Sequence, residues 1–97
     1  MLVERRPVSR KTPLDGRLEI TKIGAVRLGG LGDGFQVKIG DEQSPARVRT
    51  EECTCRDPEM PHIHYYLESD ALKRLEPGHD VELDLEGSGN LIRVVPV

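Results

Sequence analysis

Short runs of alternating apolar and polar residues, separated by glycine and proline clusters, are the feature that most limits how this chain can fold. Residues 81–86 alternate without a break, and residues 35–39 repeat the pattern. Because successive side chains of a strand point to opposite faces of a sheet, such alternation predicts half-buried strands. The segments expected to be strands are residues 2–8, 17–28, 35–39, 46–55, 62–69, 81–86 and 91–96.

The last two of these segments also predict their own pairing. If residues 88–89 form a two-residue loop, Leu85 lies opposite Ile92 and Leu83 lies opposite Val94. A slip by one residue would turn the apolar side chains of one strand to the wrong face. The sequence therefore predicts this register, with Ile92 and Val94 inside.

The remaining segments are expected to be turns. Residues 10–16 and the glycine-rich residues 29–34 are predicted to be exposed turns, and Ser69 or Asp70 can cap a short helical turn. We therefore expect an all-β, mainly antiparallel fold. It would be a small barrel or sandwich of about six to seven strands with one short helical turn, forming a single domain over residues 1–97.

The composition predicts a lean core. Apolar residues make up 36% of the chain and aromatic residues 3%, and the formal net charge is −3. A metal ion or a second subunit would add stability that so small a core lacks. No apolar run approaches the roughly 18 residues of a membrane helix, and the N-terminus has no apolar signal core. We expect a cytoplasmic protein without a membrane partner, in which two cysteines do not make a disulfide framework.

Two cysteines and two histidines carry the chemistry that the sequence suggests. Cys53 and Cys55 would point to one face of their strand, and His62 and His64 to one face of theirs. Both pairs lie on the parity opposite to the apolar residues of their strands. With residues 56–61 as a loop, Cys55 would pair with His62 and Cys53 with His64. Two cysteines with two histidines are a common tetrahedral zinc set, so we predict that these four residues bind zinc.

Other interpretations of this cluster stay open. Each residue alone is typical of a small buried cysteine or a surface histidine, and iron–sulfur or copper ligation is an alternative to zinc. Four protein ligands would make the site structural, whereas an open position would make it catalytic. Glu51, Asp57 and Glu59 are the carboxylates expected nearby, and His79 is expected to pack rather than to bind metal.

Charge is divided unevenly along the chain, with an excess of Lys and Arg in residues 1–49 and of Asp and Glu in residues 50–97. Arg47 and Arg49 are candidate contacts to nucleic acid. The glycine-rich segment lacks the Gly-Lys-Ser/Thr ending of a phosphate-binding loop, and no Ser–His–Asp order can be defended. Further cations for such an interface are Arg5, Arg6, Arg10 and Lys11.

The C-terminal third contains the pieces Tyr66-Leu67, Pro77-Gly78 and Leu91-Ile92, with residues 70–75 and 81–83 between them. In these pieces it resembles the strand–turn–hairpin of AbrB/MazE-type swapped-hairpin regulators. Those domains usually place Asp directly after the glycine, where this chain has a histidine, and they do not as a pattern carry the Cys and His pairs. No DNA-binding residue is transferred from this resemblance.

These observations favour a zinc-stabilised β-barrel interaction module without catalytic activity. A protein partner or a homodimer would suit such a module. The alternatives are a nucleic-acid-binding regulator and, third, a small metallo-enzyme.

Overall fold

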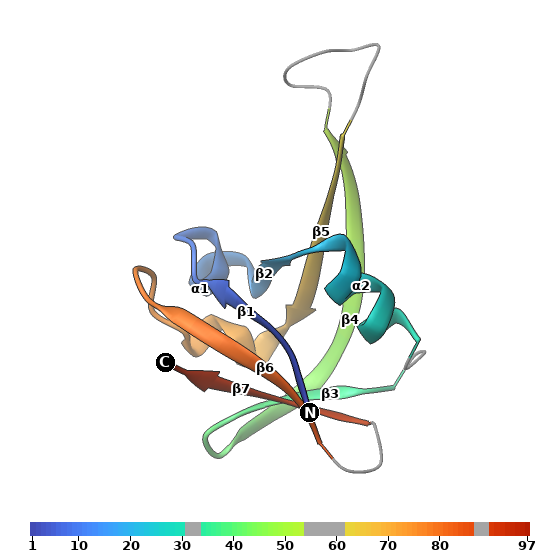
Figure 1. Cartoon of the computed structure of the whole chain (residues 1–97). Helices are drawn as coiled ribbons and strands as arrows, with labels where there is room; N and C mark the ends of the chain where they lie inside the picture. Colours follow the sequence, from blue (N-terminus) through green and yellow to red (C-terminus); the bar gives the residue numbers. More distant parts are fainter. Residues whose placement is uncertain (31–33, 54–61, 87–89) are drawn as a thin grey trace.

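A computed structural model describes residues 1–30, 34–53, 62–86 and 90–97 of the chain. Within these ranges seven strands form one sheet in the order β1-β6-β7-β3-β4-β5-β2, in which β3 and β7 are parallel and the other neighbours antiparallel (Figure 1). The expected mostly β, mainly antiparallel fold is confirmed, although the sheet is not closed into a barrel. The elements are β1 (Leu2–Pro7), α1 (Lys11–Asp15), β2 (Arg17–Ile20), α2 (Lys22–Gly29), β3 (Gln36–Ile39), β4 (Glu42–Cys53), β5 (His62–Ser69), the 3-10 helix η1 (Asp70–Arg74), β6 (Asp80–Glu86) and β7 (Leu91–Pro96).

The long strand β4 joins the two halves of the sheet. Its first residues pair with β3, and from Ala46 onward it pairs with β5. The side chains enclosed by the curved sheet, α2 and η1 form one hydrophobic cluster. The largest fully buried apolar side chains are Phe35, Leu18, Leu28, Leu67, Leu72, Leu83, Ile92, Val37, Val81 and Val94.

The pairing of β6 with β7 follows the register predicted from alternation. Leu85 lies opposite Ile92 and Leu83 opposite Val94, and both Ile92 and Val94 are buried. The loop expected at residues 88–89 lies outside the described residues. Alternation was sufficient here because each strand presents its apolar side chains to the same enclosed face.

The prediction of one strand over residues 17–28 is wrong, because the chain turns into helix α2 after β2. The Thr21 hydroxyl accepts a hydrogen bond from the Gly24 N–H at 3.1 Å, which caps the helix. Ala25 and Leu28, three residues apart, are buried on one side of the helix, whereas Val26 is 68% exposed. The apolar residues after Thr21 therefore follow a helical period. The predicted turn over 29–34 begins where α2 ends, and its residues 31–33 lie outside the described ranges.

The predicted turn over residues 10–16 contains a short helix, α1, which is capped at its C-terminal end by Gly16. Gly16 has φ of 68°, and a Cβ there would lie 2.7 Å from the carbonyl oxygen of Ser69. The Ser69 N–H donates to the Gly16 carbonyl at 2.9 Å. This close contact holds the C-terminal end of α1 beside the end of β5. With α1, α2 and η1, the fold has more helix than the single turn that was expected.

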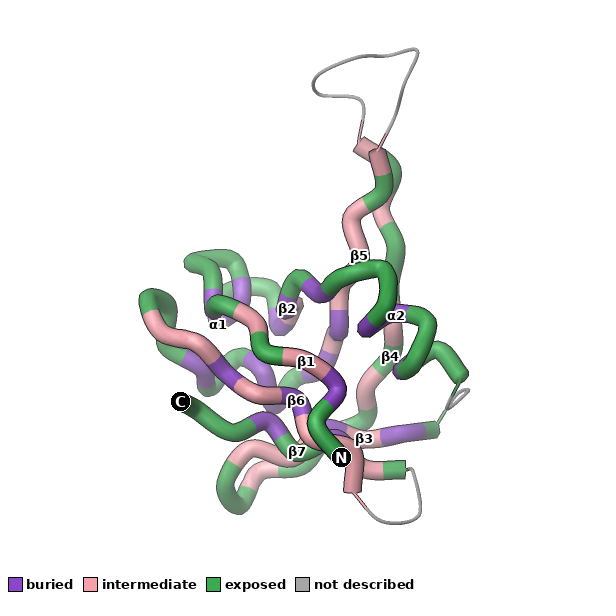
Figure 2. Tube along the Cα trace, in the orientation of Figure 1, coloured by how far each residue is buried: buried purple, intermediate pink, exposed green. Residues whose placement is uncertain are grey.

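Beyond the last pair with β2, the ends of β4 and β5 extend past the rest of the sheet as a two-stranded arm, defined here as residues 51–53 and 62–64 (Figure 1). None of these residues is buried (Figure 2). Ile63, on the apolar parity of β5, is 52% exposed because no other layer covers that face of the arm. The arm therefore owes little of its order to hydrophobic packing.

Candidate metal centre

The described part of the arm brings Cys53, His62 and His64 together. Cys53 and His62 are directly opposite each other in the β4–β5 ladder, and His64 follows on the same face. The ligand atoms of the three side chains all lie within 4.8 Å of one another. The sequence thus placed these three residues on one shared face correctly.

The expected register of the arm is wrong by two residues. Cys53 lies opposite His62 instead of His64, and Glu51 lies opposite His64. A slip of two residues leaves every side chain on its original face, so alternation cannot detect it. Cys55, the expected partner of His62, lies outside the described residues, as does the expected loop 56–61.

Glu19 of β2 reaches the centre from a distant part of the sequence. Its Oε2 lies 2.7 Å from Nδ1 of His64. Hydrogen bonds with Glu19 and with Cys53 raise the pKa of His64 above its ordinary value, although burial acts to lower it. No sequence signal indicated Glu19, because the pairing of β2 with β5 is not visible in the alternation. Asp57 and Glu59, expected beside the site, lie outside the described residues.

Below the three ligands, the same face of β2, β4 and β5 carries a network of ion pairs. Arg17 contacts Glu51 at 2.8 Å and Glu68 at 2.9 Å. Arg47 donates to Glu68 at 2.7 Å, and Arg49 lies 3.6 Å from the same carboxylate. Burial raises the pKa of Glu68, but hydrogen bonds from Arg47 and Arg17 lower it below its ordinary value overall. The two arginines suggested for nucleic acid thus contact carboxylates of their own sheet.

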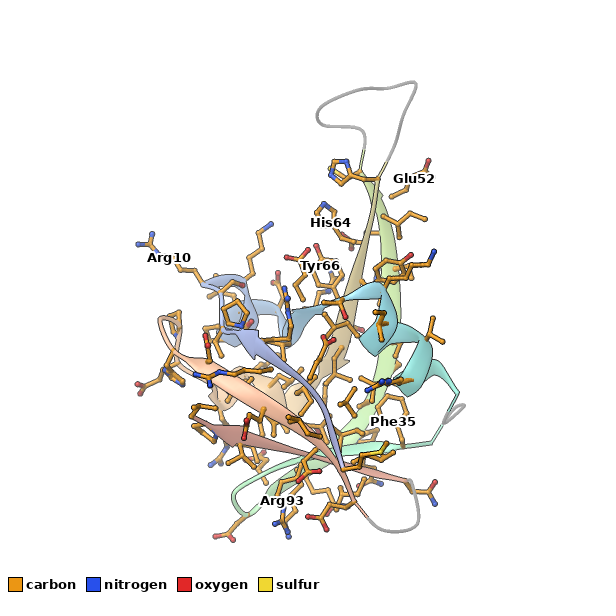
Figure 3. The ribbon with its side chains drawn as sticks, viewed as in Figure 1. Arg10, Phe35, Glu52, His64, Tyr66 and Arg93 are labelled. Atoms are coloured by element: carbon orange, nitrogen blue, oxygen red, sulfur yellow. The ribbon has the colours of Figure 1, made fainter. Side chains whose placement is uncertain are left out.

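A groove of about 610 Å³ lies between the arm, β2 and α1. The side chains of His64 and Tyr66 point from β5 toward α1, whereas the Glu52 side chain points to the other side of the arm (Figure 3). Two of the three candidate ligands, Cys53 and His64, thus stand beside this groove. The side chains and backbone that line the groove include Ser9, Arg10, Lys11, Asp15, Arg17, Glu19, Glu51, Cys53, His64 and Tyr66.

One thiol and two imidazoles are a donor set that suits zinc. With Zn–N and Zn–S bonds of about 2.0–2.3 Å, the ligand atoms of a tetrahedral site lie roughly 3.3–3.6 Å apart. The separations of up to 4.8 Å at this centre would have to shorten by about 1 Å for the atoms to close around an ion. Cys53, His62 and His64 could hold a metal ion.

No protein-family model, curated protein or solved structure matches the chain. The resemblance of residues 64–97 to swapped-hairpin regulators is therefore not accompanied by a family assignment. Among the described residues, no helix is both long and apolar enough to cross a membrane.

Proposed function

We propose that this chain is a small zinc-stabilised β module, in which Cys53, Cys55, His62 and His64 bind one zinc ion. The observation that supports this most is the convergence of three soft or borderline ligands within 4.8 Å on the polar face of the arm. Cys55 is two residues beyond Cys53 and is proposed as the fourth ligand on the basis of the sequence. Thiolate ligands suit a reducing compartment such as the cytoplasm.

The position of the centre on the arm suggests that the ion would stabilise the pairing of β4 with β5. The arm has no buried residue, so its two strands are held by their ladder and by polar contacts. A zinc ion bound to both strands would join them near the last described pair, Cys53 and His62. Four protein ligands would close the coordination shell, which favours a structural ion over a catalytic one. The zinc-ordered arm would then serve as a contact surface for a protein partner or a second copy of the chain.

The direct test is zinc stoichiometry, measured by native mass spectrometry and elemental analysis of protein purified without chelator. We expect one zinc per wild-type chain and loss of the ion in H62A and H64A. H79A is the matched control, because His79 precedes β6 and is not part of the cluster. A wild-type protein that takes up no zinc, or an H64A variant that still binds it as wild type does, would contradict the proposal.

A metallo-enzyme is a second candidate, favoured by the groove that reaches both Cys53 and His64. It requires an open coordination position facing the groove. Cobalt-substituted protein distinguishes the two: four protein ligands leave the visible spectrum unchanged when azide or cyanide is added, whereas an open position changes it.

The arginines proposed for nucleic-acid binding already contact acceptor groups of the chain itself. Arg5 binds Asp80 at 3.0 Å, and Arg6 donates to the Glu19 carbonyl at 2.9 Å. Arg47 and Arg49 contact the acidic network on the sheet. Phosphates would therefore compete with carboxylates, and we prefer the interaction module. Nucleic-acid binding at low salt that falls steeply as salt is raised would reverse this preference.

A further inference from the structure

We infer that Glu19 is a positioning residue for the zinc centre: it holds the His64 ring by Nδ1 and leaves Nε2 to bind the metal. This inference rests on the proposed zinc site and adds a residue from another strand to it. The observation behind it is the 2.7 Å contact between Glu19 Oε2 and His64 Nδ1. Metal-binding histidines commonly donate their second ring N–H to a carboxylate in this way.

The sheet determines which carboxylate reaches His64. In the β2–β5 ladder Glu19 lies opposite Tyr66, two residues from His64 on the same face. Side chains in such diagonal positions are within reach of each other when they are long. Glu51 is directly opposite His64 on the other neighbouring strand, but its carboxylate binds Arg17 at 2.8 Å. Glu19 is therefore the carboxylate that contacts the imidazole.

Among the residues that the structure describes, the charged partner of the Glu19 carboxylate is His64. In the part of the chain that the structure describes, its carboxylate pairs with no arginine or lysine, although Arg17 is only two residues away. Arg17 instead contacts Glu51 and Glu68. Because Arg17 pairs with these two carboxylates, the Glu19 carboxylate is available to His64.

The contact also selects the tautomer of His64. An ionised carboxylate only accepts hydrogen bonds, so Nδ1 must carry the proton that is shared with Glu19. The lone pair of the neutral ring is then on Nε2, which is the nitrogen left for a metal ion. Glu19 contacts Nδ1 of His64, and the candidate ligand Cys53 is a second hydrogen-bond partner of the His64 side chain.

The test compares zinc affinities, measured by competition with a chromophoric chelator, in wild type, E19A, E19Q and the control E52A. Glu52 precedes Cys53 but points to the other side of the arm, so E52A removes a nearby charge without touching His64 (Figure 3). We expect E19A to bind zinc about 10–100-fold more weakly. E19Q should lose less, because its amide oxygen can still accept from Nδ1. E52A should stay within about twofold of wild type.

A second readout separates positioning from general stability. Carbon-13 and nitrogen-15 shifts of zinc-bound His64 report which ring nitrogen binds the metal, and we expect Nε2 in the wild type. Melting of the zinc-free proteins should be nearly the same for wild type and E19A, because the Glu19 side chain is 47% exposed.

Unchanged affinity in E19A, or ligation through Nδ1, would overturn this inference while leaving the zinc site intact. A wild-type protein that binds no zinc would overturn both proposals together.

Discussion

The His64→Ala variant tests whether metal binding at the arm stabilises the whole chain. If zinc binds the folded protein and not the unfolded one, free zinc at about a thousand times Kd adds about 4.1 kcal/mol to the free energy of unfolding. For a chain of this size, that increment raises Tm by roughly 15–30 °C. The His64 side chain is 33% exposed and its pair with Glu19 lies near the surface. Without metal, H64A should therefore differ from wild type by at most about 1 kcal/mol.

The assay is thermal and urea unfolding of wild type, H64A and H79A, each with excess zinc and with chelator. Wild type and H79A should show the full zinc-dependent increase, and H64A should lose most of it while keeping its zinc-free stability. Equal zinc-dependent increases in H64A and wild type would show that zinc acts elsewhere. A large loss of stability in zinc-free H64A would show that His64 supports the fold directly, and would refute the reasoning from exposure.

Three further predictions concern the fold that carries the centre. Leu83→Ala should lower the free energy of unfolding, measured with urea, by about 2–5 kcal/mol, because Leu83 is fully buried. The control Val26→Ala should change it by less than about 0.5 kcal/mol, because Val26 is 68% exposed. The pKa of Glu68 is lower in the folded chain than in the unfolded chain, so its ion pairs add to the free energy of unfolding above the unfolded-state pKa. That contribution is lost as the pH falls through the folded-state pKa. E68Q should therefore lose less stability on acidification than wild type, as measured by urea unfolding from neutral to acidic pH. Gly16→Ala should lower the free energy of unfolding by more than about 1 kcal/mol, because φ at this position is +68° and the new Cβ would meet the Ser69 carbonyl oxygen. An unchanged midpoint in urea unfolding would contradict the close contact between α1 and β5.

Much of the fold followed from local pattern. The β6–β7 register and the bounds of β5 were predicted from alternation, as was the burial of Ile92 and Val94. Residues 22–29 were mispredicted because their apolar residues fit a strand period as well as a helical one over so short a span. The capping bond from Gly24 to Thr21, and the packing of Leu28 in the core, favour the helix.

The sequence by itself determined that Cys53, His62 and His64 share a polar face, because residues two apart in a strand always point the same way. Only the tertiary structure decided which residues lie opposite one another in the arm, since a slip of two residues leaves that face unchanged. It also decided which carboxylate holds His64. Glu19 is 45 residues away along the chain and reaches the ring only because β2 pairs with β5. Local periodicity encodes the direction of side chains, whereas the choice of neighbouring strand depends on packing across the whole sheet.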